Sequence, residues 1–400
     1  MTDLTQIFRL TEHIYPSKES LEEVLKSGRK LRIYFGIDPT GAKIHIGHAV
    51  PLRLLKSFQN LGHKVTLVVG DFTGAIGDPS GRDTRRPVLT SEQIVKNSNT
   101  YKNQVQKILS FSSNPPKITY NSTWWDKINS REFLEIVSHV TLAQLLERDL
   151  FQERLKKGNP ISVSEFLYPL LQGYDSVALD ADVEIGATDQ TFNMLIGREL
   201  VKIYKTKEKL VITTPLLEGT DGRKMSKSFN NTVDIDNDPN DMYGKIMSIN
   251  DNLIIKYLKL ATDISDAEIS KIESSIKKVE LNPMEAKKKL AYEIVRIYNG
   301  NKIAKTAAIE FERVFQKGKR TSTVQTSVQS RSILPISYAS LATISGATSS
   351  VSETVRLASS SGLKVDGRLV ANPRELIKKI SGNETIIDVG KRKSVKIIWK

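Results

Sequence analysis

Cysteine is absent from the 400 residues. Disulfide bonds, thiolate metal sites and cysteine nucleophiles are therefore excluded, and a reducing, cytoplasmic setting is the simplest expectation. The sequence also lacks a run of about eighteen apolar residues, so we expect no membrane-spanning helix and no membrane partner. Acidic residues near the N-terminus, among them Asp3 and Glu12, are unlike a signal or transit peptide.

Acidic residues are fewer than basic residues. Lys and Arg number 59 against 45 Asp and Glu, which gives a formal net charge of +14 at pH 7. This excess fits a polyanionic partner, either nucleic acid or an acidic membrane face, although a protein that is simply basic would show it too. Hydrophobic residues at 39% and charged residues at 26% are close to globular averages and exclude wholesale disorder.

Strand and helix signals alternate near the N-terminus. A β-rich apolar run at 31–36 is followed by helical spacing over 46–60 and by a second apolar run at 64–70. This order predicts an α/β fold with a parallel, Rossmann-like sheet and helices on both faces, to which 211–214 adds a later strand. Residues 90–200 are mainly helical in pattern.

The length favours two or three domains, and the character of the sequence changes along it. We predict a catalytic domain with a helical insertion, a helical bundle, a flexible linker and a small basic α+β module. Their predicted borders are 1–232, 233–318, 319–333 and 334–400. The linker assignment rests on polar composition without apolar periodicity.

His45-Ile-Gly47-His48 stands where the first strand passes into its helix. Residues three apart lie on one helical face, so both imidazoles can act together. The N–H groups and partial positive charge of a helix N-terminus favour phosphate, and Gly47 would let a flat base lie against the backbone. The motif therefore suits the binding of ATP, although two histidines on a helix surface with no binding role would show the same sequence.

Lys224-Met-Ser-Lys-Ser228 follows the turn formers Asp221-Gly222. Two lysines three apart in a loop provide point charges for a pyrophosphate, and an exposed basic loop is the plain alternative. The two motifs lie in this order, roughly 180 residues apart, which makes the signal stronger than either motif alone. Together they resemble the HIGH and KMSKS signatures of class I aminoacyl-tRNA synthetases.

Further stretches narrow the resemblance. They are Tyr34-Phe-Gly-Ile-Asp38-Pro-Thr40, Ile76-Gly-Asp78-Pro-Ser-Gly81, Tyr168-Pro-Leu-Leu-Gln172-Gly-Tyr-Asp175 and Gly186-Ala-Thr-Asp189-Gln190. With these motifs the sequence resembles the tyrosyl-tRNA synthetase family over nearly its full length, including an end module similar to the S4 RNA-binding domain. Thr191 and Phe192 stand where many members have tryptophan and glycine, which indicates a less common branch.

The resemblance implies a site for tyrosine. In family terms the pocket residues are Tyr34 and Asp175 at the phenol hydroxyl, Asp78, Tyr168 and Gln172 around the ammonium, and Gln190 near the carboxylate. Phenylalanine would leave the buried acceptor Asp175 unpaired, so no editing domain should be needed; this enzyme family is itself the standard example of that argument.

The resemblance also implies a site for ATP. The residues assigned to it are Gly36, Asp38, Gly47 and Ser226 along the nucleotide, Asp189 at the ribose, Thr40 and His45 at the γ-phosphate, His48 near the nucleotide, and Lys224, Lys227, Arg82 and Arg86 at the pyrophosphate. Mg²⁺ would travel with ATP and be held mainly by its phosphates, since no dedicated carboxylate cluster for a metal is visible.

The function implied is activation of L-tyrosine by ATP and its transfer to the 3′ end of tRNA(Tyr), by a homodimer that the tRNA bridges. A tryptophanyl-tRNA synthetase shares the fold, but the Tyr34 and Asp175 pair and the S4-like module weigh against it. A nucleotidyltransferase would explain the Rossmann-like core but neither the KMSKS-like loop nor the end module. An RNA-binding protein built on a decayed synthetase is the third alternative, and the intact signatures weigh against it.

Overall fold

The computed structural model describes residues 3–80, 89–226, 229–316, 325–380, 382–390 and 393–400. The chain divides into two compact units. The first consists of Met1–Asn237 with Ser248–Leu290, and the second of Asp238–Met247 with Ala291–Lys400. Within the described ranges no helix has the length and apolar character needed to span a membrane.

A six-stranded sheet forms the centre of the first unit, in the order β1-β6-β5-β2-β3-β4. All neighbouring strands are parallel except β1, which runs antiparallel to β6 at the edge. The strands are β1 (His13–Tyr15), β2 (Arg32–Ile37), β3 (Lys64–Val69), β4 (Lys117–Tyr120), β5 (Val183–Ala187) and β6 (Leu210–Thr214). The predicted parallel α/β sheet is therefore confirmed.

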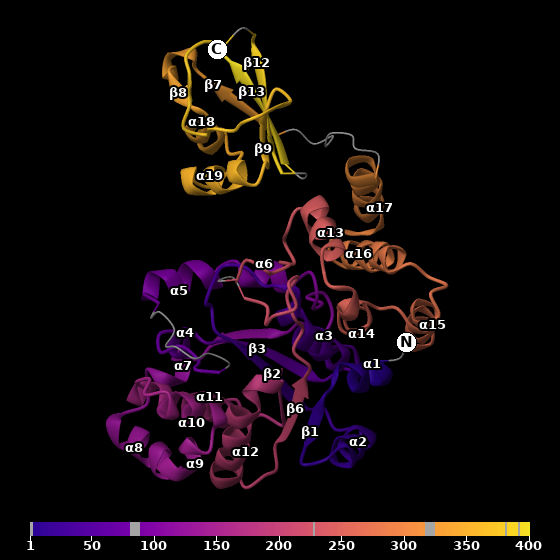
Figure 1. Ribbon diagram of the computed structural model, residues 1–400. Coiled ribbons are helices and arrows are strands. Elements are labelled where there is room, and N and C mark those ends of the chain that lie inside the picture. Colours follow the sequence, from indigo (N-terminus) through magenta and orange to yellow (C-terminus); the bar gives the residue numbers. More distant parts are fainter. Residues whose placement is uncertain (1–2, 81–88, 227–228, 317–324, 381, 391–392) are drawn as a thin grey trace. The chain divides into compact units, whose positions relative to one another are not determined.

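Helices cover both faces of this sheet (Figure 1). Helix α3 (Ile46–Asn60), over the predicted range, packs on β2, β3 and β5, while α12 (Thr191–Lys205) packs on β5 and β6 from the other face. The remaining helical elements of this unit are α1 (Asp3–Leu10), α2 (Lys18–Lys26), α4 (Asp71–Gly74), α5 (Ser91–Ser98), α6 (Tyr101–Val105), α7 (Ser122–Trp125), α8 (Ser130–Ser138), α9 (Leu142–Leu146), α10 (Asp149–Lys156), α11 (Val163–Ala178), η1 (Thr188–Gln190), η3 (Asp251–Leu253), α14 (Ile254–Ala261) and α15 (Asp266–Lys277).

Two glycines let α11 and α12 cross at short range. A Cβ atom on Gly173 would lie 2.9 Å from the backbone nitrogen of Gly197, so a side chain at this crossing would push the helices apart. The close crossing brings neighbouring polar side chains into contact: Asn193 Nδ2 of α12 donates to Gln172 Oε1 of α11 at 2.8 Å. Both side chains matter for the site described below.

The predicted border between the catalytic domain and the bundle 233–318 differs from this division, because α14 and α15 belong to the first unit. Arg9 of α1 donates to the carbonyl oxygens of Leu258 and Lys259 at 2.7 Å each. Arg53 of α3 donates to the carbonyl oxygen of Thr262, also at 2.7 Å. Arginine side chains that satisfy helix-terminal carbonyls thus attach these helices to the sheet-bearing unit.

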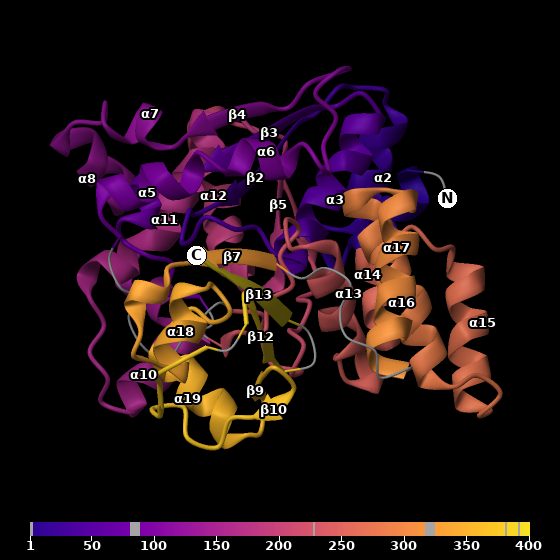
Figure 2. The ribbon, with the colours of Figure 1, turned by 90° about the horizontal axis from the view of Figure 1, so that it is seen from above.

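The second unit contains α13 (Pro239–Met247), α17 (Asn301–Phe311) and the π-helical turn η4 (Glu312–Gln316), and α16 (Pro283–Asn299) spans the border between the units. It ends in a five-stranded sheet in the order β10-β9-β12-β13-β7, with α18 and α19 on one face (Figure 2). These later elements are β7 (Gln325–Gln329), η5 (Arg331–Ile333), β8 (Ile336–Ser337), α18 (Tyr338–Ile344), α19 (Val351–Ser359), β9 (Leu363–Val365), β10 (Arg368–Leu369), β11 (Leu376–Ile377), β12 (Glu384–Val389) and β13 (Lys393–Trp399).

The predicted linker 319–333 contains a strand, which the sequence reading missed. Residues 325–329 form β7 and pair in parallel with β13. Because β7 is the edge strand of the sheet, it needs few apolar side chains, and its Val328 is 52% exposed. A polar edge strand carries no hydrophobic periodicity, so its composition alone looks like that of a linker. Residues 319–324 of the predicted linker lie outside the described ranges.

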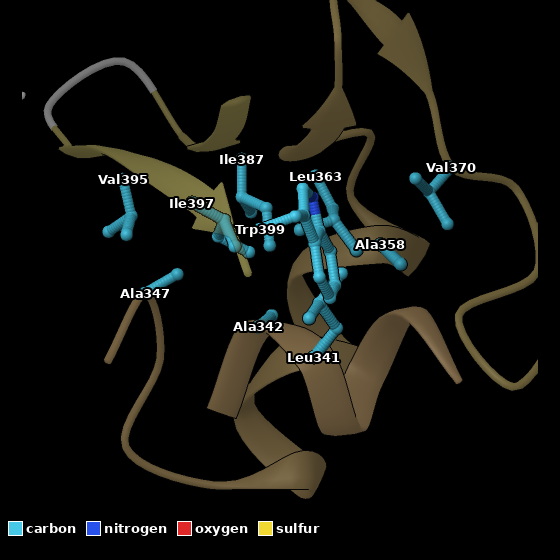
Figure 3. Close-up of a cluster of buried hydrophobic side chains, with 10 residues drawn as sticks. All are labelled: Leu341, Ala342, Ala347, Ala358, Leu363, Val370, Ile387, Val395, Ile397 and Trp399. Carbon is cyan, nitrogen blue, oxygen red and sulfur yellow. The ribbon is translucent and has the colours of Figure 1, made fainter. Parts of the chain in front are cut away.

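The core of the C-terminal module is a cluster between this sheet and its two helices (Figure 3). Trp399 of β13 lies over Leu341 of α18, and the indole Nε1 donates to Thr385 Oγ1 at 2.9 Å. The full set of buried members is Leu341, Ala342, Ala347, Ala358, Leu363, Val370, Ile387, Val395, Ile397 and Trp399.

A matched pair of leucines tests this core. Leu341 is fully buried, so Leu341→Ala should cost about 2–5 kcal/mol of module stability, whereas Leu369→Ala, at a side chain 51% exposed, should cost about 0.5 kcal/mol or less. Hydrogen–deuterium exchange of β12 and β13 in the full chain measures the loss. Equal protection in both variants would contradict the packing described.

Candidate active site

A cavity of about 860 Å³ opens at the carboxyl ends of the parallel strands of the first unit. It is lined by Gly36 and Ile37 of β2, by Gly70 just after β3 and by Gly186 and Ala187 of β5. Strand order reverses between β5 and β2, and open α/β sheets bind ligands at such a point because connections leave it in opposite directions. The cavity at the carboxyl ends of β2, β3 and β5 is therefore at the position where open α/β sheets bind ligands.

His45 and His48 form one side of the cavity at the N-terminus of α3. His45 is the N-cap residue, and its Nδ1 accepts from the backbone nitrogen of His48 at 3.4 Å. The two rings stack with centroids 3.7 Å apart, so they lie together as their spacing predicts. A Cβ atom on Gly47 would lie 3.0 Å from His45 Nδ1, so glycine leaves room for this stack.

A chain of amide groups includes two residues of the cavity lining, Gln172 and Gln190. Gln190 Nε2 donates to Asp78 Oδ2 at 2.8 Å, and Asp78 Oδ1 accepts from the backbone nitrogen of Ser80 at 2.9 Å. Asn193 Nδ2 donates to both Gln172 Oε1 and Gln190 Oε1, at 2.8 and 3.2 Å. These bonds fix which end of each amide is oxygen, because a carboxylate can only accept.

Asp175 on α11 lies at the cavity wall, although it is only 5% exposed. Its Oδ1 accepts from the indole nitrogens of Trp124 and Trp125 at 2.8 and 3.2 Å, and its Oδ2 accepts from Asn121 Nδ2 at 3.3 Å. Burial raises the pKa of Asp175 to about 8, although the three N–H donors oppose the rise. The result is a polar group held in place inside apolar surroundings.

Tyr34, a predicted contact of the phenol hydroxyl, is a buried residue of β2. Its side chain is 2% exposed and is not among the described residues that line the cavity. Its hydroxyl lies 2.7 Å from Ser176 Oγ, and the ring packs with Val68, Trp124 and Leu179. The hydroxyl therefore meets a buried serine one residue beyond Asp175, and its contact with a phenol hydroxyl stays a prediction.

Tyr168 and Asp38 meet in the cavity, where the tyrosine hydroxyl donates to Asp38 Oδ2 at 2.8 Å. Thr73 Oγ1 donates to the other carboxylate oxygen of Asp38, also at 2.8 Å. Because the Tyr168 proton goes to a carboxylate, its oxygen offers acceptor capacity to a further partner. This corner of the cavity is therefore rich in acceptors and suited to a cation.

Lys224 reaches the cavity from the loop that follows β6, and its Nζ lies 2.6 Å from Asp189 Oδ2. Asn231 holds this loop together. Its Nδ2 donates to Asp221 Oδ1 and to the Lys224 carbonyl oxygen, and its Oδ1 accepts from the backbone nitrogen of Ser226. The hydrogen bond from Asn231 is the main cause that lowers the pKa of Asp221 to about 2.

A family model described as tRNA synthetases class I (W and Y) matches residues 26–316, which is more than half of the chain. The chain belongs to this family. The tyrosine–tRNA ligase of Thermotoga maritima is 44% identical over 385 residues, 95% of this chain and 94% of the relative. That of Haemophilus ducreyi is 41% identical over 398 residues, 99% of this chain and 98% of the relative.

A solved structure agrees with this family. The C-terminally truncated mitochondrial tyrosyl-tRNA synthetase of Coccidioides posadasii is 26% identical, with a TM-score of 0.63, and the match covers 77% of this chain and 91% of that one. The α/β fold with a parallel sheet is therefore that of class I synthetases.

The structure brings most of the sequence-predicted site residues to one cavity. Those that line it are Gly36, Asp38, Thr40, His45, Gly47, His48, Asp78, Tyr168, Gln172, Asp175, Asp189, Gln190, Lys224 and Ser226. Arg82, Arg86 and Lys227 lie outside the described residues. The individual roles assigned to these side chains stay predictions.

Sequence reasoning missed Arg148, a side chain near the cavity. Arg148 donates to Ser80 Oγ and stacks over Phe151 and Phe192, with the guanidinium carbon 5.4 and 5.7 Å from the ring centroids. Burial lowers its pKa, while Asp78 is the first of the nearby groups that raise it. A lone arginine at the start of a short helix gives no sequence signal that would distinguish it from a surface charge.

Asp175 should make stability depend on pH. Between an unfolded-state pKa near 4 and the folded value of about 8, the folded chain holds a proton that the unfolded chain has released, so rising pH destabilises the fold. The free energy of unfolding of the native chain, relative to Asp175→Asn, should fall by up to about 1.4 kcal/mol per pH unit from about pH 5 to 8. Urea unfolding at several pH values measures this, and a constant difference would contradict the burial argument.

Proposed function

We propose that this chain is a tyrosine–tRNA ligase. It activates L-tyrosine with ATP to tyrosyl-adenylate and pyrophosphate, then transfers the tyrosyl group to the 3′ end of tRNA(Tyr). Relatives named as tyrosine–tRNA ligases, more than 40% identical over nearly the whole chain, support the reaction. The observation on which the substrate rests is Asp175, a buried carboxyl group at the cavity wall.

The phenol hydroxyl of tyrosine pairs with Asp175 in either protonation state of the carboxyl. An ionised carboxylate accepts the phenol proton, and a protonated carboxyl can donate its own. Phenylalanine offers neither bond and would leave a buried polar group unsatisfied, which is costly. The donors on Trp124, Trp125 and Asn121 hold the carboxyl in one orientation, so it cannot turn away from a wrong substrate.

The ammonium of tyrosine fits the acceptors of Asp78, Tyr168 and Gln172, which line the cavity. One carboxylate and two neutral oxygens neutralise a cation without an excess of negative charge. Gln190, which donates to Asp78, would then lie near the substrate carboxylate, the group that attacks phosphorus. The amino acid is therefore held at both ends, and the reacting oxygen faces the nucleotide half of the cavity.

ATP fits against the N-terminus of α3, where His45, His48 and Thr40 can donate to phosphate oxygens. Mg²⁺ enters with ATP as part of the substrate; within the described ranges no group of three His, Asp or Glu side chains could hold a metal ion. Lys224, paired with Asp189, would exchange that carboxylate for a phosphate as charge develops on the pyrophosphate. Lys227, Arg82 and Arg86 are predicted to add charge at the same leaving group.

In the second step, a terminal hydroxyl of tRNA attacks the carbonyl carbon of the adenylate and AMP leaves. The net charge of +14 favours the approach of this polyanion, and the basic C-terminal module is predicted to contact it by shape and phosphate contacts. A cytoplasmic location is part of the proposal, since tRNA and ATP are both present there.

A homodimer is part of the proposal. Helices α8 to α11 expose large apolar side chains, Leu134, Leu142, Leu155 and Val163, at 66, 63, 50 and 73%. Exposed apolar side chains of this size along one segment are typical of a surface that a second copy covers.

The activity is tested by ATP–pyrophosphate exchange with each of the twenty amino acids. Exchange should depend on tyrosine. Exchange with tryptophan alone would replace the proposal with the tryptophanyl reaction, and no exchange with any amino acid would contradict a synthetase and favour an RNA-binding protein.

The wall of the tyrosine pocket predicts different effects for two substitutions. Asp175→Ala should raise the KM for tyrosine about a hundredfold or more, since it removes the buried carboxyl proposed to pair with the phenol hydroxyl. Tyr34→Phe, which removes a hydroxyl bonded to Ser176, should change this KM by less than about threefold. A large increase of this KM in Tyr34→Phe would instead support the predicted contact of Tyr34 with the phenol hydroxyl.

Removal of residues 325–400 should separate the two steps. The cut removes β7 together with its partner β13, so no strand is left unpaired. Tyrosine-dependent exchange should persist, while the rate of tRNA charging should fall about tenfold or more because phosphate contacts are lost. Unchanged charging would contradict an RNA role for the module.

A further inference from the structure

A buried ion pair lies next to the proposed tyrosine site, outside the residues that line it. Lys209 Nζ donates to Glu184 Oε2, and the two side chains are 0% and 2% exposed. Lys209 also donates to Ser176 Oγ at 2.7 Å and to the Met194 carbonyl oxygen at 3.1 Å. All three ammonium protons are therefore used, and burial lowers the pKa of this lysine.

The protons around this pair can be assigned one by one. Ser176 donates its single proton to Glu184 Oε2 at 3.1 Å. The Tyr34 hydroxyl, 2.7 Å from Ser176 Oγ, must then be the donor in that bond. The remaining carboxylate oxygen, Glu184 Oε1, accepts from Gln172 Nε2 at 3.2 Å. The ion pair thus connects directly to a residue of the cavity wall.

Glu184 dictates the orientation of the Gln172 amide. A carboxylate held by a lysine can only accept, so the NH₂ end of Gln172 must face it and the carbonyl oxygen must face away. At the far end of the same wall, Asp78 sets Gln190 in the same way, and Asn193 Nδ2 bridges the two amide oxygens. Two carboxylates therefore align a relay of three amides from both ends.

We propose that Glu184, fixed by Lys209, is a positioning residue that turns the Gln172 carbonyl oxygen toward the ammonium of the amino acid substrate. This rests on the proposed tyrosine site. Neither Glu184 nor Lys209 lines the cavity among the described residues, so both act through Gln172. A neutral side chain at 184 would let the Gln172 amide turn over and present its NH₂ group to a cation, which repels it.

The test compares KM values for tyrosine and for ATP in pyrophosphate exchange. The double variant Glu184→Gln with Lys209→Met removes both charges together, so neither is left buried and unpaired. It should raise the KM for tyrosine about tenfold or more and leave the KM for ATP within about twofold. Its thermal unfolding should stay closer to that of the native chain than that of either single variant.

Controls separate positioning from stability. Ser176→Ala removes the serine's hydrogen bonds to Lys209, Glu184 and Tyr34 but keeps both charges and the bond between Glu184 and Gln172, and should leave the KM for tyrosine within about threefold. Asn193→Ser keeps the ion pair and loosens the relay at its middle, where Asn193 bridges Gln172 and Gln190, so it should raise that KM. Because KM does not depend on how much enzyme is folded, partial unfolding leaves the readout intact, and Asn193→Ser decides if the double variant cannot be purified.

The outcomes are distinct. If the native chain shows no tyrosine-dependent exchange, the proposed function fails. If the native chain exchanges with tyrosine while the double variant and Asn193→Ser keep a native KM for tyrosine, the positioning role is wrong and the ion pair is only structural. Equal increases in the KM for tyrosine and ATP would also overturn it.

Discussion

Burial of a carboxyl group without hydrogen-bond partners costs free energy. The proposed tyrosine half of this site depends on the partners that offset this cost at Asp175. Three N–H donors from one short helix and the residue before it surround its oxygens, yet burial still raises its pKa to about 8. The group is therefore poised to exchange a proton or a hydrogen bond with a ligand hydroxyl. In the proposed function, specificity for a hydroxylated ring would follow from this one desolvated group more than from the shape of the cavity.

The same logic extends along the wall. Asp78, Asp175 and Glu184 are buried acidic groups, and each is held by donors that fix its direction: an amide and a backbone N–H, two indoles and an amide, or a lysine and a serine. Fixed acceptors can orient neighbouring amides, because an amide has one donor end and one acceptor end. Polar groups that would destabilise a core when alone thus become a rigid frame for a small zwitterion.

Sequence reasoning succeeded where chemistry is local. The histidine pair at 45 and 48 lies on one helix turn, and the strands predicted at 31–36 and 64–70 are apolar runs between turn residues. The local sequence is sufficient to predict these structures. It failed where partners are distant. Glu184 pairs with a lysine 25 residues later (184 to 209), and β7 is a strand only because β13 lies beside it. Motif resemblance predicts the neighbours of a residue, but only the fold decides which hydrogen bonds it makes.

The central claim is that the cavity at the carboxyl ends of β2, β3 and β5 holds the amino acid between Asp175 and the acceptors around Asp78. A crystal structure of the full chain soaked with L-tyrosine tests it most directly. The account predicts the phenol oxygen within hydrogen-bonding distance of the Asp175 carboxyl, with the amino group at Asp78, Tyr168 and the Gln172 carbonyl oxygen. Tyrosine bound in the reverse direction, or elsewhere with this cavity empty, would contradict it.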